Sequence, residues 1–121
     1  MLDVLLTVLF MIVGYLLGSV PTGYLVARMR GVDIQKVGSG NIGATNILRT
    51  LGAGPALIVV VLDPFKGFLA VTLPILFGMS AWTVALAGFA AVLGNNFNVF
   101  LGLRGGKGIA TSLGVFLGIE P

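Results

Sequence analysis

Hydrophobic residues fill this chain in long runs that only a few charges interrupt. Residues 4–27 form a stretch of 24 positions without a charged side chain. At about 1.5 Å of rise per residue, a helix of this length crosses a hydrocarbon core of about 30 Å with some tilt. A cleaved signal peptide fits less well, because Asp3 and no basic residue precedes the run and no small-residue cleavage pattern follows it. We therefore expect the first membrane span at about residues 4–27.

A charged pair, Asp63 and Lys66, interrupts the next apolar stretch and allows two topologies. If the pair marks a loop, the helix before it covers only the 13 residues 50–62, or about 20 Å, well below the thickness of a bilayer. We therefore place both charges inside a second span, at about residues 53–77. Their i, i+3 spacing puts them on one face of that helix, where each neutralises the other.

The turn at residues 78–80 ends the second span, and a third is expected at about residues 81–102. A further apolar helix begins near residue 109 but has only 11 residues before Glu120, too few to cross a bilayer alone. The pattern therefore predicts a single domain, residues 1–121, with an all-α fold. We expect a polytopic transmembrane helical bundle with three full spans plus the start of a fourth helix.

Two loops, at about residues 28–49 and 103–108, lie between these helices. The first is polar and glycine-rich, and we expect it to be flexible. Two complete spans separate the loops, so both face the same side of the membrane. The positive-inside rule makes that side cytoplasmic and puts the N-terminus outside. The basic residues behind this orientation are Arg28, Arg30, Lys36 and Arg49 in the first loop and Arg104 and Lys107 in the second.

The composition agrees with a membrane protein and excludes several kinds of enzyme. Hydrophobic residues make up 57% of the chain and charged residues 9%, whereas a soluble domain carries about a quarter of its residues as charges. Cysteine and histidine are both absent. Their absence removes disulfides, thiolate nucleophiles, the serine–histidine triad and the commonest metal ligands. Our predictions include no metal ion, no cofactor and no nucleic-acid partner.

The first loop has the composition of an anion-binding site. Residues 38–46 contain three glycines, two hydroxyl side chains and two amides, and Arg49 follows. Glycines let successive backbone N–H groups face one point. A helix that starts near Thr45 would add the partial positive charge of its N-terminus. Arg49, about one turn further on, could make paired hydrogen bonds to phosphate oxygens.

The second loop repeats this composition around a lysine. Gly105, Gly106 and Gly108 bracket Lys107, and the Thr111 hydroxyl follows just inside the next helix. The spacing differs from that of a Walker A loop, so a nucleotide triphosphatase is not expected. Either loop alone could simply join two membrane helices and set their orientation. Two such loops on one side of the membrane favour phosphate binding.

Polar residues inside or near the spans allow two interpretations each. Asp63 and Lys66 form either a buried ion pair that fixes one helix against its neighbours or a second cationic group near the site. Asn95, Asn96 and Asn98 are either interfacial polar residues or an amide cluster that holds a ligand hydroxyl. Both alternatives stay open at this point.

Four stretches of the chain together match a known pattern. They are Gly18-Ser19-Val20-Pro21 with Gly23, then Gly38-Ser39-Gly40-Asn41-Ile42-Gly43-Ala44-Thr45-Asn46 with Arg49, then Asp63 with Lys66-Gly67, and finally Gly105-Gly106-Lys107-Gly108-Ile109-Ala110-Thr111. In this order they resemble the bacterial membrane glycerol-3-phosphate acyltransferases of the PlsY family. The resemblance extends over almost the whole chain, and its two glycine-rich motifs are long.

The resemblance implies an enzyme that transfers a fatty acyl group from acyl phosphate to the 1-hydroxyl of sn-glycerol 3-phosphate, in the first step of phospholipid synthesis. Its products are lysophosphatidic acid and inorganic phosphate, and it needs neither a metal ion nor acyl-CoA. It also implies a multi-pass protein of the bacterial plasma membrane, with membrane lipids and the two phosphorylated substrates as partners. Both substrates carry phosphate, which fits two phosphate-suited loops on the cytoplasmic side.

The same resemblance gives roles to residues of both loops. Ser39, Arg49 and Lys107 grip phosphate, and Lys107 with fixed N–H groups stabilises the charge that develops on the acyl carbonyl oxygen and the leaving phosphate. Direct attack by the glycerol hydroxyl is expected, without an acyl-enzyme. The candidate catalytic residues are Lys107, Ser39 and Asn95. The candidate phosphate-binding residues are Gly38, Ser39, Gly40, Asn41, Thr45, Asn46, Arg49, Gly105, Gly106, Lys107 and Gly108.

Two features depart from the family pattern. Asn95 stands where the family typically has histidine, and an amide cannot take a proton at neutral pH, so a substrate phosphate becomes the expected base. Family members are longer and carry a third polar motif toward the C-terminus. This departure allows a chain that is inactive alone, and a C-terminal segment acting in trans becomes a candidate partner.

A function from a different class stays open as the alternative. In an anion transporter or channel subunit, the basic glycine-rich loops would bind the anion, and Asp63 and Lys66 would line its path.

Overall fold

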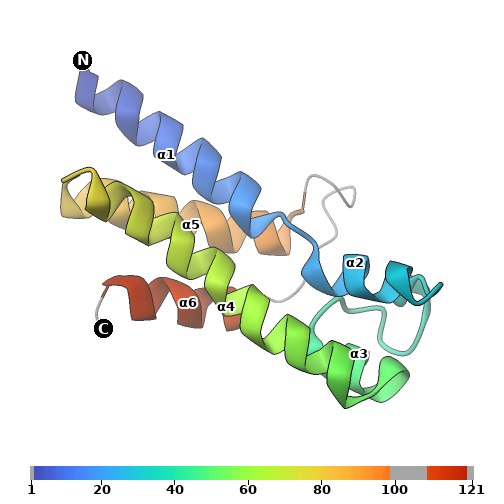
Figure 1. Ribbon diagram of the computed structural model, residues 1–121. Coiled ribbons are helices and arrows are strands. Elements are labelled where there is room, and N and C mark those ends of the chain that lie inside the picture. The colour runs from blue at the N-terminus through green and yellow to red at the C-terminus, as the bar shows by residue number, and fades with distance from the viewer. Residues whose placement is uncertain (1, 99–108, 120–121) are drawn as a thin grey trace.

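All regular structure in the described part of the chain is helical, as the hydrophobic pattern predicts. The computed structural model describes residues 2–98 and 109–119 (Figure 1). The elements are α1 (Leu2–Gly18), α2 (Thr22–Met29), the 3-10 helix η1 (Ile34–Lys36), α3 (Ala44–Leu51), α4 (Ala53–Leu76), α5 (Ala81–Asn96) and α6 (Ile109–Ile119). The long helices lie side by side, and the short elements α2, η1 and α3 gather near the first half of α4 (Figure 1).

The single helix expected over residues 4–27 is in fact two helices. α1 ends at Gly18, and α2 starts at Thr22 after Pro21. Proline has no N–H to continue the helical ladder, and it disfavours the helical conformation of the residue before it, here Val20. The segment Leu2–Met29 still has 28 residues at a mean hydropathy of 2.2, enough to cross a membrane by length and composition.

α4 keeps Asp63 and Lys66 inside one helix of 24 residues, Ala53–Leu76. This agrees with the helix expected at residues 53–77 and not with a loop at the charged pair. The mean hydropathy of α4 is 2.0, and α4 is the second described helical segment that is long and apolar enough to cross a membrane. The number of spans and their orientation in the membrane stay predictions.

α5 is shorter than the helix expected for the third span. It has 16 residues and ends at Asn96, not near residue 102. The sequence at this end, Asn95 and Asn96 followed by Phe97 and Asn98, explains the difference. Asparagine side chains compete with the helix for backbone hydrogen bonds, so a run of them is a poor helix former.

Glycines let the helices pair at close range. α1 runs beside α5, and a methyl group on Gly18 would collide with the carbonyl oxygen of Ala91. α6 runs beside α4 in the same way, because a methyl group on Gly114 would collide with the carbonyl oxygen of Pro64. Small residues at helix crossings are the common solution in membranes, where packing replaces the hydrophobic effect between helices.

The segment between α2 and α4 is folded and not the flexible loop that its composition predicts. Buried isoleucines spaced along it, Ile34, Ile42 and Ile47, pack with Ala27 of α2 and with the first half of α4. Each of these isoleucines is at most 3% exposed. Three large apolar side chains among polar neighbours thus join this segment to α2 and α4 in one hydrophobic core.

Candidate functional site

One buried amide, that of Asn46, organises the first glycine-rich loop. Its Nδ2 atom donates to the carbonyl oxygens of Val37 at 2.9 Å, Asn41 at 3.1 Å and Ile34 at 3.4 Å. Its Oδ1 atom accepts from the Ser39 N–H at 3.3 Å, and the residue is only 1% exposed. Asn46 therefore holds the loop backbone in place from inside the protein. Direct contact between Asn46 and a phosphate stays a prediction.

Two further side chains close tight turns of the loop backbone. The Ser39 hydroxyl accepts from the Asn41 N–H at 3.3 Å, and the Asn41 Oδ1 atom accepts from the Gly43 N–H at 2.7 Å. Gly38 and Gly40 have φ angles of 57° and 75°, in the left-handed region that favours glycine. The glycines and short polar side chains of the motif therefore give the backbone a defined path.

The loop leads directly into α3, whose first residue is Ala44, next to the start expected near Thr45. No side chain of the described residues caps this helix, so its first-turn N–H groups can receive an anion. Thr45 and Arg49 lie one turn apart and are both exposed. Neither salt bridge between described residues involves Arg49. Ser39, the start of α3 and the Thr45–Arg49 face thus offer hydroxyl, N–H and guanidinium donors.

The second loop cannot be placed beside the first. Gly105, Gly106, Lys107 and Gly108 all lie outside the described residues. The helix that follows them is fixed against α4, because the buried Thr111 hydroxyl donates to the Asp63 carbonyl oxygen at 3.4 Å. Convergence of the two loops on one substrate stays a prediction.

The charged pair in α4 makes contacts within the protein. Lys66 Nζ lies 3.2 Å from Asp63 Oδ1, and the two side chains are 6% and 12% exposed. The same ammonium group donates to the carbonyl oxygens of Gly18 and Val20, each at 3.1 Å. These oxygens belong to the break between α1 and α2. Of the two interpretations of the pair, the geometry supports a buried ion pair that fixes neighbouring helices.

Asn95 belongs to this buried network. Its Oδ1 atom accepts from Lys66 Nζ at 2.9 Å, and the residue is 5% exposed. Ser39, the other candidate catalytic residue in the described part, is exposed in the first loop. The structure thus assigns Asn95 and Ser39 to different hydrogen-bond networks. A catalytic role for either stays a prediction.

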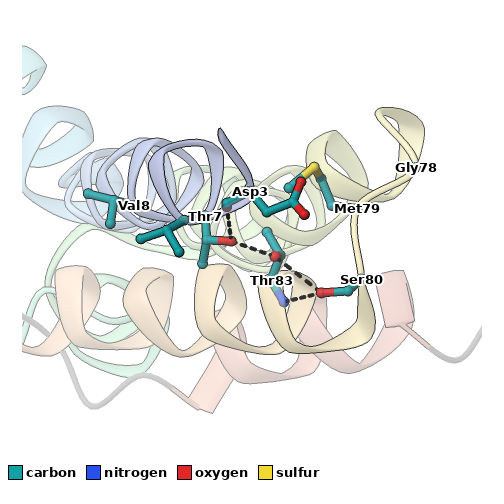
Figure 2. A pocket seen from close by; sticks show the side chains of 8 residues that line it. Asp3, Thr7, Val8, Gly78, Met79, Ser80 and Thr83 are labelled. Carbon is teal, nitrogen blue, oxygen red and sulfur yellow. Dashed lines mark hydrogen bonds between the residues drawn. The ribbon is translucent and has the colours of Figure 1, made fainter. Parts of the chain in front are cut away.

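A pocket of about 480 Å³ lies at the other end of the bundle, where the start of α1 meets the turn between α4 and α5 (Figure 2). Figure 2 shows Thr7, Thr83 and Ser80 joined by hydrogen bonds; the Thr7 and Thr83 hydroxyls are 2.8 Å apart. Because these hydroxyls bond to one another and Asp3 is the only charged residue of the lining, the pocket has little to offer a phosphate. Its lining residues are Asp3, Val4, Thr7, Val8, Gly78, Met79, Ser80 and Thr83.

Sequence reasoning missed both this pocket and the carbonyl oxygens that Lys66 binds. The pocket joins residues about 75 positions apart in the chain, and nothing in either stretch marks it. The helix break does have a signal, since Pro21 follows Gly18-Ser19-Val20 in the middle of an apolar run. Among the residues described, no group of three or more His, Cys, Asp or Glu could hold a metal ion.

Comparison with known sequences gives a consistent result. The profile of the family described as "Glycerol-3-phosphate acyltransferase" matches residues 8–121. A glycerol-3-phosphate acyltransferase of Thermus thermophilus is 57% identical over 111 residues, which are 92% of this chain and 56% of that protein. A glycerol-3-phosphate acyltransferase of Geobacter metallireducens is 52% identical over 117 residues, 97% of this chain and 60% of that protein.

Comparison with solved structures agrees. The crystal structure of PlsY (YgiH), an integral membrane glycerol 3-phosphate acyltransferase, in its glycerol 3-phosphate form superposes with a TM-score of 0.89 at 43% identity. The match covers 95% of this chain and 58% of that one. The lysophosphatidic acid form of that protein superposes with a TM-score of 0.86.

The chain spans between 56% and 60% of the length of the curated relatives described above. None of the relatives or solved structures named here is a transporter or a channel, so the alternative of an anion transporter receives no support.

Proposed function

Because this chain belongs to the glycerol-3-phosphate acyltransferase family, we propose that it acts in the transfer of a fatty acyl group from acyl phosphate to the 1-hydroxyl of sn-glycerol 3-phosphate. The products are lysophosphatidic acid and inorganic phosphate. The observation that carries the proposal is the loop built around Asn46, which sets the Ser39 hydroxyl and the uncapped start of α3 close to one another. The two substrate- and product-related forms of the similar PlsY structure support the same chemistry.

The first loop binds the phosphate of glycerol 3-phosphate. Its donors are the Ser39 hydroxyl, the first-turn N–H groups of α3 and the guanidinium group of Arg49. A guanidinium group can make two parallel hydrogen bonds to phosphate oxygens. Asn41 and Asn46 hold the backbone in this shape, while Gly38 and Gly40 supply its left-handed turns.

The second loop serves the acyl phosphate. Lys107 neutralises the leaving phosphate, and Gly105, Gly106 and Gly108 let the backbone N–H groups approach it closely. The new ester bond forms between the glycerol 1-oxygen and the acyl carbon as the bond from that carbon to phosphate breaks. The proton of the hydroxyl passes to a substrate phosphate, because Asn95 cannot accept it.

The topology suits substrates of different solubility. Three spans with the N-terminus outside put both glycine-rich loops on the cytoplasmic face of the plasma membrane. Glycerol 3-phosphate then arrives from water, while the acyl chain of acyl phosphate enters from the lipid. The apolar outer faces of α1 and α4, which include the exposed Leu9 and Val61, suit contact with lipid.

The direct experiment is acyl transfer from palmitoyl phosphate to labelled glycerol 3-phosphate by the purified 121-residue chain in nanodiscs. We expect labelled lysophosphatidic acid from the wild type and a loss of about a hundredfold or more in the Lys107→Ala variant, since that change removes a charge that stabilises the transition state. Arg28→Ala is the matched control, because Arg28 is an exposed cation of α2 that lies outside the glycine-rich stretches 38–46 and 105–108.

Binding of glycerol 3-phosphate should be measured on the same samples. Binding without product would leave the first loop as a binding site and would point to a requirement for a further segment, supplied in trans. Neither product nor binding at millimolar glycerol 3-phosphate would contradict the proposed function of this chain.

A further inference from the structure

The break between α1 and α2 lies in the middle of an apolar segment, where backbone groups need partners. In hydrocarbon, non-helical backbone is tolerated only when side chains or neighbouring helices satisfy the freed groups. Here the carbonyl oxygens of three consecutive residues, Gly18, Ser19 and Val20, each accept a hydrogen bond from a side chain. Lys66 of α4 donates to the first and the third, and Asn98 donates to the second.

The ammonium group of Lys66 is fully occupied by these contacts. An ammonium group has three N–H donors, and Lys66 Nζ has four oxygen atoms within 3.2 Å: Gly18 O, Val20 O, Asn95 Oδ1 and Asp63 Oδ1. The residue is only 5% exposed. Lys66 therefore has no donor left for a substrate, and the Asp63 carboxylate balances its charge within the protein.

The backbone that Lys66 holds leads into α2, and the start of α2 contacts the phosphate-binding loop, residues 38–46. Thr22, the first residue of α2, is only 6% exposed. Gly23 comes next and packs so closely on Ile42 that a methyl group would collide with the Ile42 carbonyl oxygen. Ile42 lies in the loop whose turns Asn41 closes. A shift of the helix break would therefore displace α2 and, through it, the loop.

We propose that Lys66 is a positioning residue for the phosphate-binding loop. Asp63 holds the ammonium group of Lys66, and this group fixes the carbonyl oxygens at the break between α1 and α2. The position of the break determines the position of Gly23, and Gly23 in turn positions the loop backbone at Ile42. The link to substrate affinity rests on the proposed function, because it assumes that this loop binds glycerol 3-phosphate. The mechanical link from Lys66 to the loop does not depend on any ligand.

The test compares the wild type with the double variant Asp63→Leu/Lys66→Met in nanodiscs. Removing both charges together avoids leaving one buried charge unpaired, so the bundle can still fold. Amide hydrogen exchange is followed by segment, and Val61→Ala, on the lipid-exposed face of α4 at 58% exposure, is the control. We expect exchange in residues 22–46 to become about tenfold faster in the double variant, with α5 within about twofold of the wild type.

Substrate kinetics supply a readout that general destabilisation would not reproduce. In the double variant, the KM for glycerol 3-phosphate should rise about tenfold while kcat stays within about twofold, because the loop is displaced but the reacting groups are unchanged. If the wild type neither binds nor turns over glycerol 3-phosphate, the proposed function fails, and hydrogen exchange still decides the role of Lys66.

Two results would overturn the proposal. One is a folded double variant whose exchange in residues 22–46 equals that of the wild type, and the other is equally faster exchange in every helix. Should the double variant not fold, Gly23→Ala tests the contact between α2 and the loop at Ile42 without changing a buried charge. Its added methyl group must displace the Ile42 carbonyl oxygen, so unchanged exchange in residues 38–46 would also overturn the proposal.

Discussion

Three polar side chains, those of Asn46, Lys66 and Asn98, bind backbone carbonyl oxygens that lie outside regular helices. All three residues are at most 5% exposed. Replacing one of these buried side chains removes all of its hydrogen bonds to the backbone at once, and each is worth about 0.5–1.5 kcal/mol. Single substitutions at these positions should therefore change the path of the backbone and not only remove a contact.

The Asn46→Ala variant tests this at the first loop. It removes four hydrogen bonds and leaves the carbonyl oxygens of Ile34 and Val37 without that donor. Because these hydrogen bonds, worth about 0.5–1.5 kcal/mol each, are lost together, we expect much faster hydrogen exchange in residues 38–43 and loss of glycerol 3-phosphate binding. Leu48→Ala, on the exposed side of α3 at 53% exposure, is the control and should behave as the wild type. A loop that keeps its protection in Asn46→Ala would contradict this role.

Local chemistry explains what the sequence could predict at this scale. The run 38–46 indicates a turn-rich anion site because glycine conformations and short side-chain-to-backbone bonds depend on near neighbours. The partners of Lys66 could not be predicted, since Gly18, Val20 and Asn95 lie 48, 46 and 29 positions away. Only the packing of three helices brings them together.

At the scale of elements, glycines determine how closely the helices approach. The pair of α4 and α6 is the tightest example, with Gly114 against the Pro64 backbone and Gly67 against the Thr111 backbone. Hydropathy predicts that such segments are apolar helices but contains no information on which faces meet. The same limit explains why the pattern predicts one helix over residues 4–27 and a flexible loop over 28–49. Pro21 divides the first segment into two helices, and three buried isoleucines fold the second, although the average composition of each segment predicts otherwise.

Two glycine-to-alanine changes should have opposite effects on stability. Gly114→Ala places a methyl group against the Pro64 carbonyl oxygen, and overpacking of this kind costs about 1–3 kcal/mol. Gly54→Ala, in the first turn of α4, meets no atom within 4 Å, and alanine favours a helix by up to about 1 kcal/mol over glycine. Thermal unfolding in detergent should show a lower midpoint for the first variant and an equal or higher midpoint for the second. A lower midpoint for both would show that space at these glycines is not the deciding factor.

At the scale of the whole molecule, the two ends of the bundle differ in chemistry. α2, η1 and α3, with Arg28, Arg30, Lys36 and Arg49, lie at one end. The pocket at Asp3, Thr7 and Ser80 lies at the other (Figures 1 and 2). This separation of the basic residues from the start of α1 is what the positive-inside rule requires for an N-terminus outside the membrane.

Labelling of single cysteines tests that orientation cleanly, because the chain has no cysteine of its own. Asp3→Cys and Lys36→Cys replace exposed residues at the two ends. In intact cells, a membrane-impermeant maleimide should label Asp3→Cys, while Lys36→Cys should react only after permeabilisation. The reverse pattern would contradict the proposed topology.

The central claim, that the loop held by Asn46 binds the phosphate of glycerol 3-phosphate, is tested most directly by calorimetric titration of the purified chain in nanodiscs. Inorganic phosphate and glycerol serve as separate competitors. We predict that glycerol 3-phosphate binds, that phosphate but not glycerol competes, and that Arg49→Ala weakens binding by about tenfold or more, since it removes a charged hydrogen-bond donor. Arg28→Ala should bind as the wild type does. Equal binding by the Arg49→Ala and Arg28→Ala variants would contradict the claim.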